Sequence, residues 1–145
     1  MSAGKVPNPE VLSCISIIVC NDIYRDEASK NLILVGTFNT IEASAFPCRH
    51  HQMSVLATLT NGNGEYKLEI GIEHEQSGVT IMMLTGATNF DTPLAVTDIH
   101  VRLEGIVFEK PGKYWVFVKA DGELLQQRPL LVRIREQRKA EMGHD

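Results

Sequence analysis

The chain has 145 residues, of which 43% are hydrophobic and 22% charged, and its formal net charge is −4. A domain of this length buries about two-thirds of its unfolded surface, so folding needs neither a disulfide nor a metal. The acidic balance gives no electrostatic reason to bind nucleic acid or an anionic membrane. Apolar runs such as Ile17–Cys20 are far shorter than the about 18 residues of a membrane span. Three scattered cysteines and no apolar N-terminal segment lead us to expect a reduced, cytoplasmic protein.

Two strands are expected in the first part of the chain, over Leu12–Cys20 and Leu32–Asn39. The first is apolar on both faces apart from two serines, which favours a central strand. The polar stretch Asn21–Asn31 is predicted to connect the two strands. A long loop that contains the Phe46-Pro47 dipeptide is predicted over Ile41–Gln52.

Alternation of apolar and polar residues is clearest in the middle of the chain. Apolar side chains occupy every second position over residues 53–59 and again over residues 66–72. Asn61–Gly64 lies between these stretches and accepts positive φ angles, so the two are predicted to form a hairpin. A reversal at Gln76–Gly78 is predicted to lead into another strand over Val79–Thr85.

Strands are also expected over Ala95–Leu103 and Lys113–Ala120. Asp121-Gly122 is typical of a two-residue type I′ turn, which would pair Ala120 with Glu123 and Val118 with Leu125. Pro129 cannot donate a hydrogen bond to the ladder. A bulge at Pro129 would explain why the apolar phase changes between Leu125 and Leu130.

These segments give about eight strands without any strand–helix alternation. The pattern predicts an all-β fold, an antiparallel Greek-key β-sandwich that is Ig-like or C2/jelly-roll-like. We expect a single domain over residues 1–145, with its core at about 11–134 and flexible ends at 1–10 and 135–145.

Cys48-Arg49-His50-His51 holds the closest group of possible metal ligands. Cys48, His50 and His51 could contribute to a zinc or copper site. Adjacent histidines point in different directions, however, and no second pair of ligands lies at zinc-finger spacing. An ordinary surface loop is therefore the favoured interpretation, and we predict neither a metal nor a cofactor.

Signals for catalysis are weak. The sequence contains no Gly-x-Ser-x-Gly elbow, no Cys-x-x-Cys pair and no glycine-rich phosphate loop that opens a helix. Strand alternation divides Glu73-His74-Glu75, placing His74 on the apolar face and both glutamates on the solvent face. The sequence therefore predicts that the protein is not an enzyme.

Binding is suggested by the strand over Lys113–Ala120, which carries large apolar residues on both faces. Alternation places Trp115 and Phe117 on one face and Tyr114, Val116 and Val118 on the other. Either this strand is central and covered on both sides, or one side is a patch for another protein or a second copy. The exposed sheet edges and the strand after Pro129 are further places where another chain could pair. The interface candidates are Trp115, Phe117, Leu130 and Val132.

The segments with the most specific turn and core chemistry are Ile18–Glu27, Leu34–Ile41, Phe46-Pro47, Gly64–Tyr66, Pro93–Ala95, Gly105–Phe108, Pro111–Tyr114 and Ala120–Leu125. Together they resemble a small bacterial family known only as a domain of unknown function. The resemblance covers about residues 15–132 and implies a compact β-sandwich, with no catalytic residue, cofactor or substrate. This chain departs from the family pattern at Asn21, where an acidic residue is usual, and at residues 48–51, where the family has at most one histidine.

The leading hypothesis is a non-catalytic β-sandwich that binds protein, either a partner or another copy of itself. The alternative is a small-ligand or metal-binding sandwich that uses the loops at residues 21–27 and 41–52, because loops on a rigid sheet commonly carry such sites. Neither hypothesis includes nucleic acid or a membrane as a partner.

Overall fold

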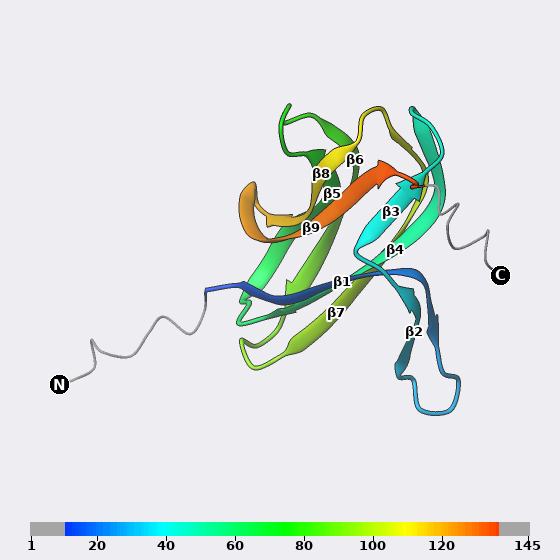
Figure 1. Ribbon diagram of the computed structural model, residues 1–145. Helices are drawn as coiled ribbons and strands as arrows, with labels where there is room; N and C mark the ends of the chain where they lie inside the picture. The colour runs from blue at the N-terminus through cyan, green and yellow to red at the C-terminus, as the bar shows by residue number, and fades with distance from the viewer. Residues whose placement is uncertain (1–10, 137–145) are drawn as a thin grey trace.

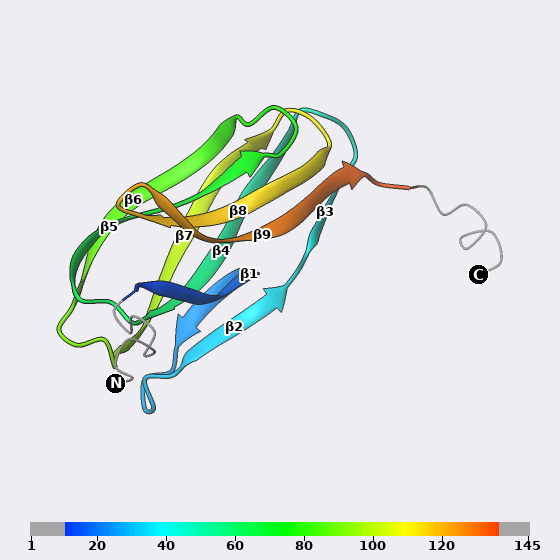
Figure 2. The ribbon, with the colours of Figure 1, turned by 90° about the vertical axis from the view of Figure 1, so that its left-hand side faces the viewer.

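The computed structural model describes residues 11–136, which form two packed layers of β-strands (Figures 1 and 2). No helix occurs within this range, and hence no helix that could cross a membrane. The strands are β1 (Ser13–Arg25), β2 (Leu32–Thr37), β3 (Thr40–Ala43), β4 (Cys48–Thr60), β5 (Gly64–His74), β6 (Thr80–Phe90), β7 (Val96–Phe108), β8 (Gly112–Ala120) and β9 (Glu123–Ile134).

Two sheets make up the layers, sheet A with the order β2-β1-β4-β7 and sheet B with the order β3-β9-β8-β5-β6. The hairpins β1–β2, β5–β6 and β8–β9 each stay within one sheet, whereas the other connections cross between the layers. The prediction of an all-β sandwich is confirmed. The antiparallel rule has one exception, because β3 pairs with β9 in parallel.

The predicted hairpin between residues 53–59 and 66–72 is wrong. β4 lies in sheet A between β1 and β7, and β5 lies in sheet B between β8 and β6. The turn at Asn61–Gly64 therefore carries the chain from one layer to the other. The two apolar stripes face each other across the core instead of lying side by side, which buries both stripes equally well.

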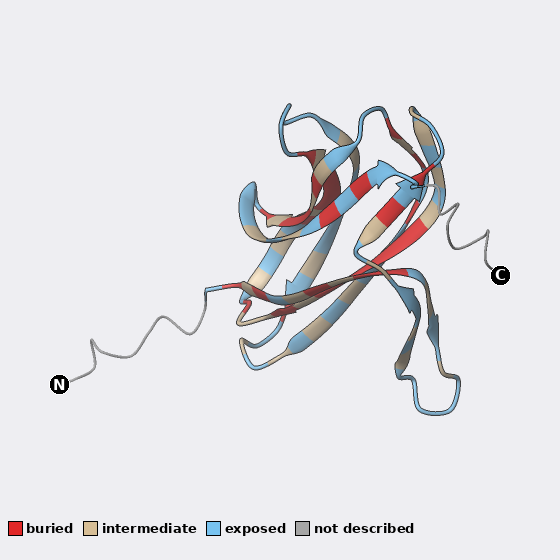
Figure 3. Ribbon diagram, viewed as in Figure 1, coloured by how far each residue is buried: buried red, intermediate tan, exposed pale blue. Residues whose placement is uncertain are grey.

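The core lies between the sheets, where the inward-facing side chains of both layers meet (Figure 3). Its largest fully buried side chains include Phe108 and Tyr114, whose rings meet edge to face with centroids 4.9 Å apart. The stripe on β4, Met53, Val55, Ala57 and Leu59, is completely buried. Period-2 alternation in the sequence thus becomes one apolar interior.

Two predicted loops are partly strand. β1 continues to Arg25, so the connection before β2 is shorter than the predicted Asn21–Asn31. Inside the predicted loop Ile41–Gln52, β3 pairs with β9 and β4 already begins at Cys48. The two differences have different causes. Residues 22–25 pair with β2 in a local hairpin, whereas β3 and the start of β4 find their hydrogen-bond partners on the distant strands β9 and β7.

The C-terminal hairpin has the predicted turn but a different register. Asp121 and Gly122 have φ angles of 51° and 86°, as a type I′ turn requires, and Ala120 pairs with Glu123. The register then shifts between Val118 and Lys119, so that Val118 pairs with Gln126 instead of Leu125. The bulge is therefore next to Leu125, and the prediction of a bulge at Pro129 is wrong.

Pro129 is accommodated in another way. It lies opposite Trp115 on β8, and β3 pairs with β9 only from Leu131 onwards. β3 does not pair with β9 at Pro129, so no backbone hydrogen bond is lost because proline lacks an N–H. The predicted flexible ends are residues 1–10 and 135–145. Residues 1–10 and 137–145 lie outside the described residues, and Arg135 and Glu136 follow the end of β9.

Candidate protein-interaction site

One edge of sheet B lacks the features that normally block strand addition. β6 pairs with β5 and with no other strand of residues 11–136, and its eleven residues include neither a charge nor a proline. Natural sheets usually protect an edge with charged residues, prolines or very short strands. β7, at the edge of sheet A, carries Asp98, Arg102 and Glu104, and β3 has only four residues. β6 is thus the long, unprotected edge.

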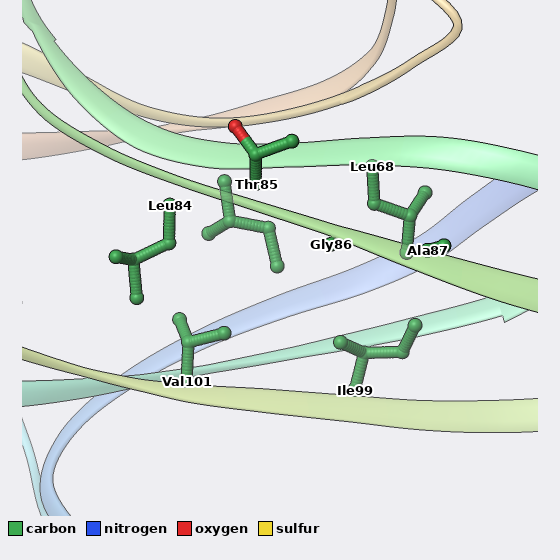
Figure 4. A pocket seen from close by; sticks show the side chains of 8 residues that line it. Leu68, Leu84, Thr85, Gly86, Ala87, Ile99 and Val101 are labelled. Atoms are coloured by element: carbon green, nitrogen blue, oxygen red, sulfur yellow. The ribbon is translucent and has the colours of Figure 1, made fainter.

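An apolar slot adjoins this edge where β6 and β7 part (Figure 4). Leu84 faces the slot and is 41% exposed, whereas Thr85 points away from it. The cavity of about 240 Å³ is smaller than the roughly 300–1,000 Å³ of small-molecule pockets. Its size suits a few apolar side chains of a polypeptide. It is lined by Leu68, Ile70, Leu84, Thr85, Gly86, Ala87, Ile99 and Val101.

A second apolar element projects from the opposite side of the molecule. The β1–β2 hairpin extends below the sandwich in Figure 1, and among the described strands β2 packs closely against β1 alone. None of residues 21–40 is buried, although β2 begins with four large apolar residues in a row. Ile33 and Val35 are 46% and 45% exposed on one face of β2. We call residues 21–37 the arm.

The predicted interface residues on β8 and β9 are mostly buried. Leu130 and Val132 are each 1% exposed in the core, so their prediction as interface residues is wrong. The strand after Pro129 is no free edge either, because it lies between β8 and β3. The bulge in β9 shifts the phase of the strand, so that these two side chains point into the core.

Phe117 and Trp115 lie on the outer face of sheet B, opposite the inward-facing Tyr114, Val116 and Val118. Phe117 is nevertheless only 2% exposed, because its ring lies over Gly71 on β5. Trp115 is half-buried, and the Lys113 ammonium lies 4.4 Å from the centre of its ring. The central-strand interpretation therefore holds for Phe117, and neither aromatic leaves a wide open patch.

The Cys48-Arg49-His50-His51 segment belongs to a strand and not to a surface loop. Cys48 and His50 pair with Phe108 and Ile106, which are core residues, whereas His51 is exposed. Among the described residues, no three side chains of the metal-binding types come together here or elsewhere. The fold therefore separates His51 from the other two candidate ligands.

His50 is the polar group in this segment that is least well accommodated. Its Nε2 is buried and has no hydrogen-bond partner, and its ring lies 5.8 Å from that of Phe38. Burial lowers the pKa of His50, an effect opposed by the backbone carbonyl of Gln52 and reinforced by the nearby His51. The folded protein thus favours the neutral imidazole.

We expect His50 to make the protein less stable in mild acid. In the unfolded chain the pKa of His50 returns to about 6.5, so the unfolded state binds a proton more strongly than the folded state does. Lowering the pH below that value therefore favours unfolding. The urea midpoint of the wild type should fall more between pH 7.5 and pH 5.5 than that of His50→Gln. Equal falls for the two proteins would contradict this role of His50.

His74 and Ser77 form a serine–histidine pair that the sequence did not suggest. Ser77 Oγ lies 2.9 Å from Nδ1 of His74, and the backbone N–H of Ser77 also donates to that nitrogen. Oγ in turn accepts a hydrogen bond from the N–H of Val79. No carboxylate hydrogen-bonds His74 within the described chain. These contacts close the turn between β5 and β6, as the predicted reversal at Gln76–Gly78 requires.

The model of a family of unknown function (DUF6941) matches residues 15–133. The chain belongs to this family. The match begins within β1 and ends within β9, so it includes strands of both sheets, and the resemblance to a family of unknown function is confirmed. No curated protein matches the chain.

Among solved structures, this DUF6941 member is similar to an immunoglobulin-like protein from Pseudomonas aeruginosa. The two chains are 11% identical, with a TM-score of 0.40, and the comparison covers 85% of this chain and 97% of that chain. Neither the family description nor this neighbour assigns a binding partner to the β6 edge.

Sequence reasoning expected exposed sheet edges to bind but did not single out β6. The available signal was the run Thr80–Phe90, which lacks charge and proline. A buried central strand has the same composition. Only the strand order shows that this run lies at an edge.

Proposed function

We propose that the protein is a non-catalytic binding module that pairs a strand of another polypeptide with the free edge of β6. The observation that supports this most directly is the unprotected, eleven-residue edge beside an apolar slot. Strand addition of this kind uses backbone hydrogen bonds for affinity and pockets for alternate side chains for specificity. The slot would receive the inward-facing side chains of the added strand.

The chemistry of β6 indicates what kind of strand it would accept. Met83 on the outer face and Leu84 on the slot face are 44% and 41% exposed. A partner strand beside them would gain most by carrying apolar residues on both faces. β6 offers no charged group for an ion pair, so the binding is expected to depend little on salt.

A photo-reactive amino acid at Thr85 provides the test. The variant is produced in the organism that encodes the protein and irradiated there, and the cross-linked peptide is identified by mass spectrometry. Thr85 is exposed on the outer face of β6, so the probe leaves the slot free. The matched position is His100, which is exposed on the neighbouring strand β7. We expect a cross-linked polypeptide from Thr85 and none from His100.

Two substitutions at Gly86 show whether the cross-link depends on the slot. A Cβ at Gly86 would have no atom within 4 Å, so both variants should fold. Gly86→Lys places a charge beside the slot and should abolish the cross-link, whereas Gly86→Ala should retain it. Absence of any adduct at Thr85, or an adduct that Gly86→Lys leaves unchanged, would refute the proposed function.

A further inference from the structure

We infer that the strand received by β6 is the arm of a second copy of this chain, so that copies join head to tail. This inference rests on the proposed function and names its partner. Residues 11–136 contain two strand edges without charge, β2 and β6, and the other two edges of the sheets are charged or short. Each of the two uncharged edges lacks a neighbour within the described chain.

The arm and the slot have complementary surfaces. Leu32 and Leu34 lie on one face of β2, and Ile33 and Val35 lie on the other. Paired with β6, one of these faces would cover the slot and the other would lie beside Met83. Both faces of β6 expose apolar side chains in the same way, so a strand with a single apolar face would leave one of them uncovered.

Within one molecule the arm cannot reach the slot beside β6. β2 is the first strand of sheet A, and β7, at the far end of that sheet, lies next to β6. The arm and the slot are therefore on opposite sides of the sandwich. A contact between two different patches on opposite sides is heterologous, and repeating it builds a ring or an open filament instead of a closed dimer.

Symmetric pairing of two β6 strands fits less well. It would pair the free backbone groups of both edges, but it would leave the arm uncovered with Tyr24, Ile33 and Val35 45–55% exposed. Arm-to-slot pairing covers both apolar elements with one contact. The same surfaces therefore favour head-to-tail assembly.

Blocking each side of the contact separately tests this arrangement. Val35→Lys places a charge on the arm but leaves the slot intact, and Gly86→Lys does the reverse. Light scattering should show wild-type particles larger than a monomer, growing with concentration, whereas each variant alone should be monomeric. An equimolar mixture of the two variants should form a 1:1 heterodimer and nothing larger, because one intact arm and one intact slot remain.

Controls distinguish blocked assembly from misfolding. Val35→Thr and Gly86→Ala should assemble like the wild type, and Ile33→Lys should behave like Val35→Lys. Circular dichroism should show the same β-structure in every variant. A monomeric wild type, or a Val35→Lys variant that still assembles alone, would overturn the head-to-tail inference.

The photo-cross-link separates this inference from the proposed function. An adduct from Thr85 to residues 32–37 of a second copy is the expected result. An adduct to a different protein would overturn head-to-tail assembly while upholding strand addition at β6. No adduct at Thr85 would overturn both.

Discussion

Replacing Tyr114 by alanine should lower the free energy of unfolding by about 3–5 kcal/mol. The Tyr114 side chain is 1% exposed and packs edge to face against Phe108 and within 4.8 Å of the His74 ring. β8 is a central strand, so the surrounding strands are hydrogen-bonded on both sides and can close the cavity only in part. Urea denaturation followed by tryptophan fluorescence measures the loss.

Tyr114→Phe is the matched control. It keeps the ring and removes the hydroxyl, which donates a hydrogen bond to the backbone carbonyl of Lys110. We expect this variant to lose only about 1 kcal/mol. If Tyr114→Ala lowered the free energy of unfolding no more than Tyr114→Phe does, the packing of the ring would not be what stabilises the core.

Gly71→Ala should be the second strongly destabilising substitution, with a cost of about 3 kcal/mol, at the upper end of the range for overpacking. A Cβ at this position would lie 2.4 Å from the carbonyl oxygen of Met82 and 2.8 Å from Cζ of Phe117. The first contact is to the backbone of β6, so a side-chain rotation cannot relieve it. Either the β5–β6 ladder or the packing of Phe117 must shift.

Gly86→Ala is the control, because Gly86 lies opposite Leu68 in the same ladder and a Cβ there meets nothing within 4 Å. Alanine should leave the free energy of unfolding unchanged or raise it slightly, by reducing the entropy of the unfolded chain. Thermal unfolding compares the two variants directly. Equal melting temperatures would contradict the proposed crowding at Gly71.

Gly71 also bears on the proposed function. β6 is held by β5 alone, so a displaced β5–β6 ladder would carry the free edge and the slot with it. Gly71→Ala should therefore weaken the Thr85 cross-link even in molecules that remain folded, whereas Gly86→Ala should not. Comparing the two variants thus tests whether binding of a strand requires an undistorted β5–β6 ladder.

The predicted interface residues show where sequence reasoning reaches its limit. Strand alternation correctly placed Trp115 and Phe117 on the face opposite Tyr114, because alternation is a property of a single extended chain. Whether that face is open depends on the neighbouring strand. Gly71 on β5 gives the Phe117 ring room to lie against the sheet, and nothing near residue 117 in the sequence indicates this.

The sequence by itself determined the class of fold and most of its local features. Period-2 patterns specified strands with one buried face, and Asp121-Gly122 specified its type I′ turn, because each property depends on residues that are close together in the chain. Beyond the C-terminal hairpin, only the tertiary structure decided which strands are neighbours in a sheet. The stripes of β4 and β5 could have paired in one sheet, but they face each other across two.

The candidate binding site depends on the same decision. The uncharged run Thr80–Phe90 is as suitable for the centre of a sheet as for its edge, and the apolar strand β2 is as suitable for a core as for the surface. Strand order left both exposed, at opposite sides of the sandwich. Pairing between distant strands is a long-range choice among segments of similar composition, so the edges, the slot and the arm could be identified only in the folded chain.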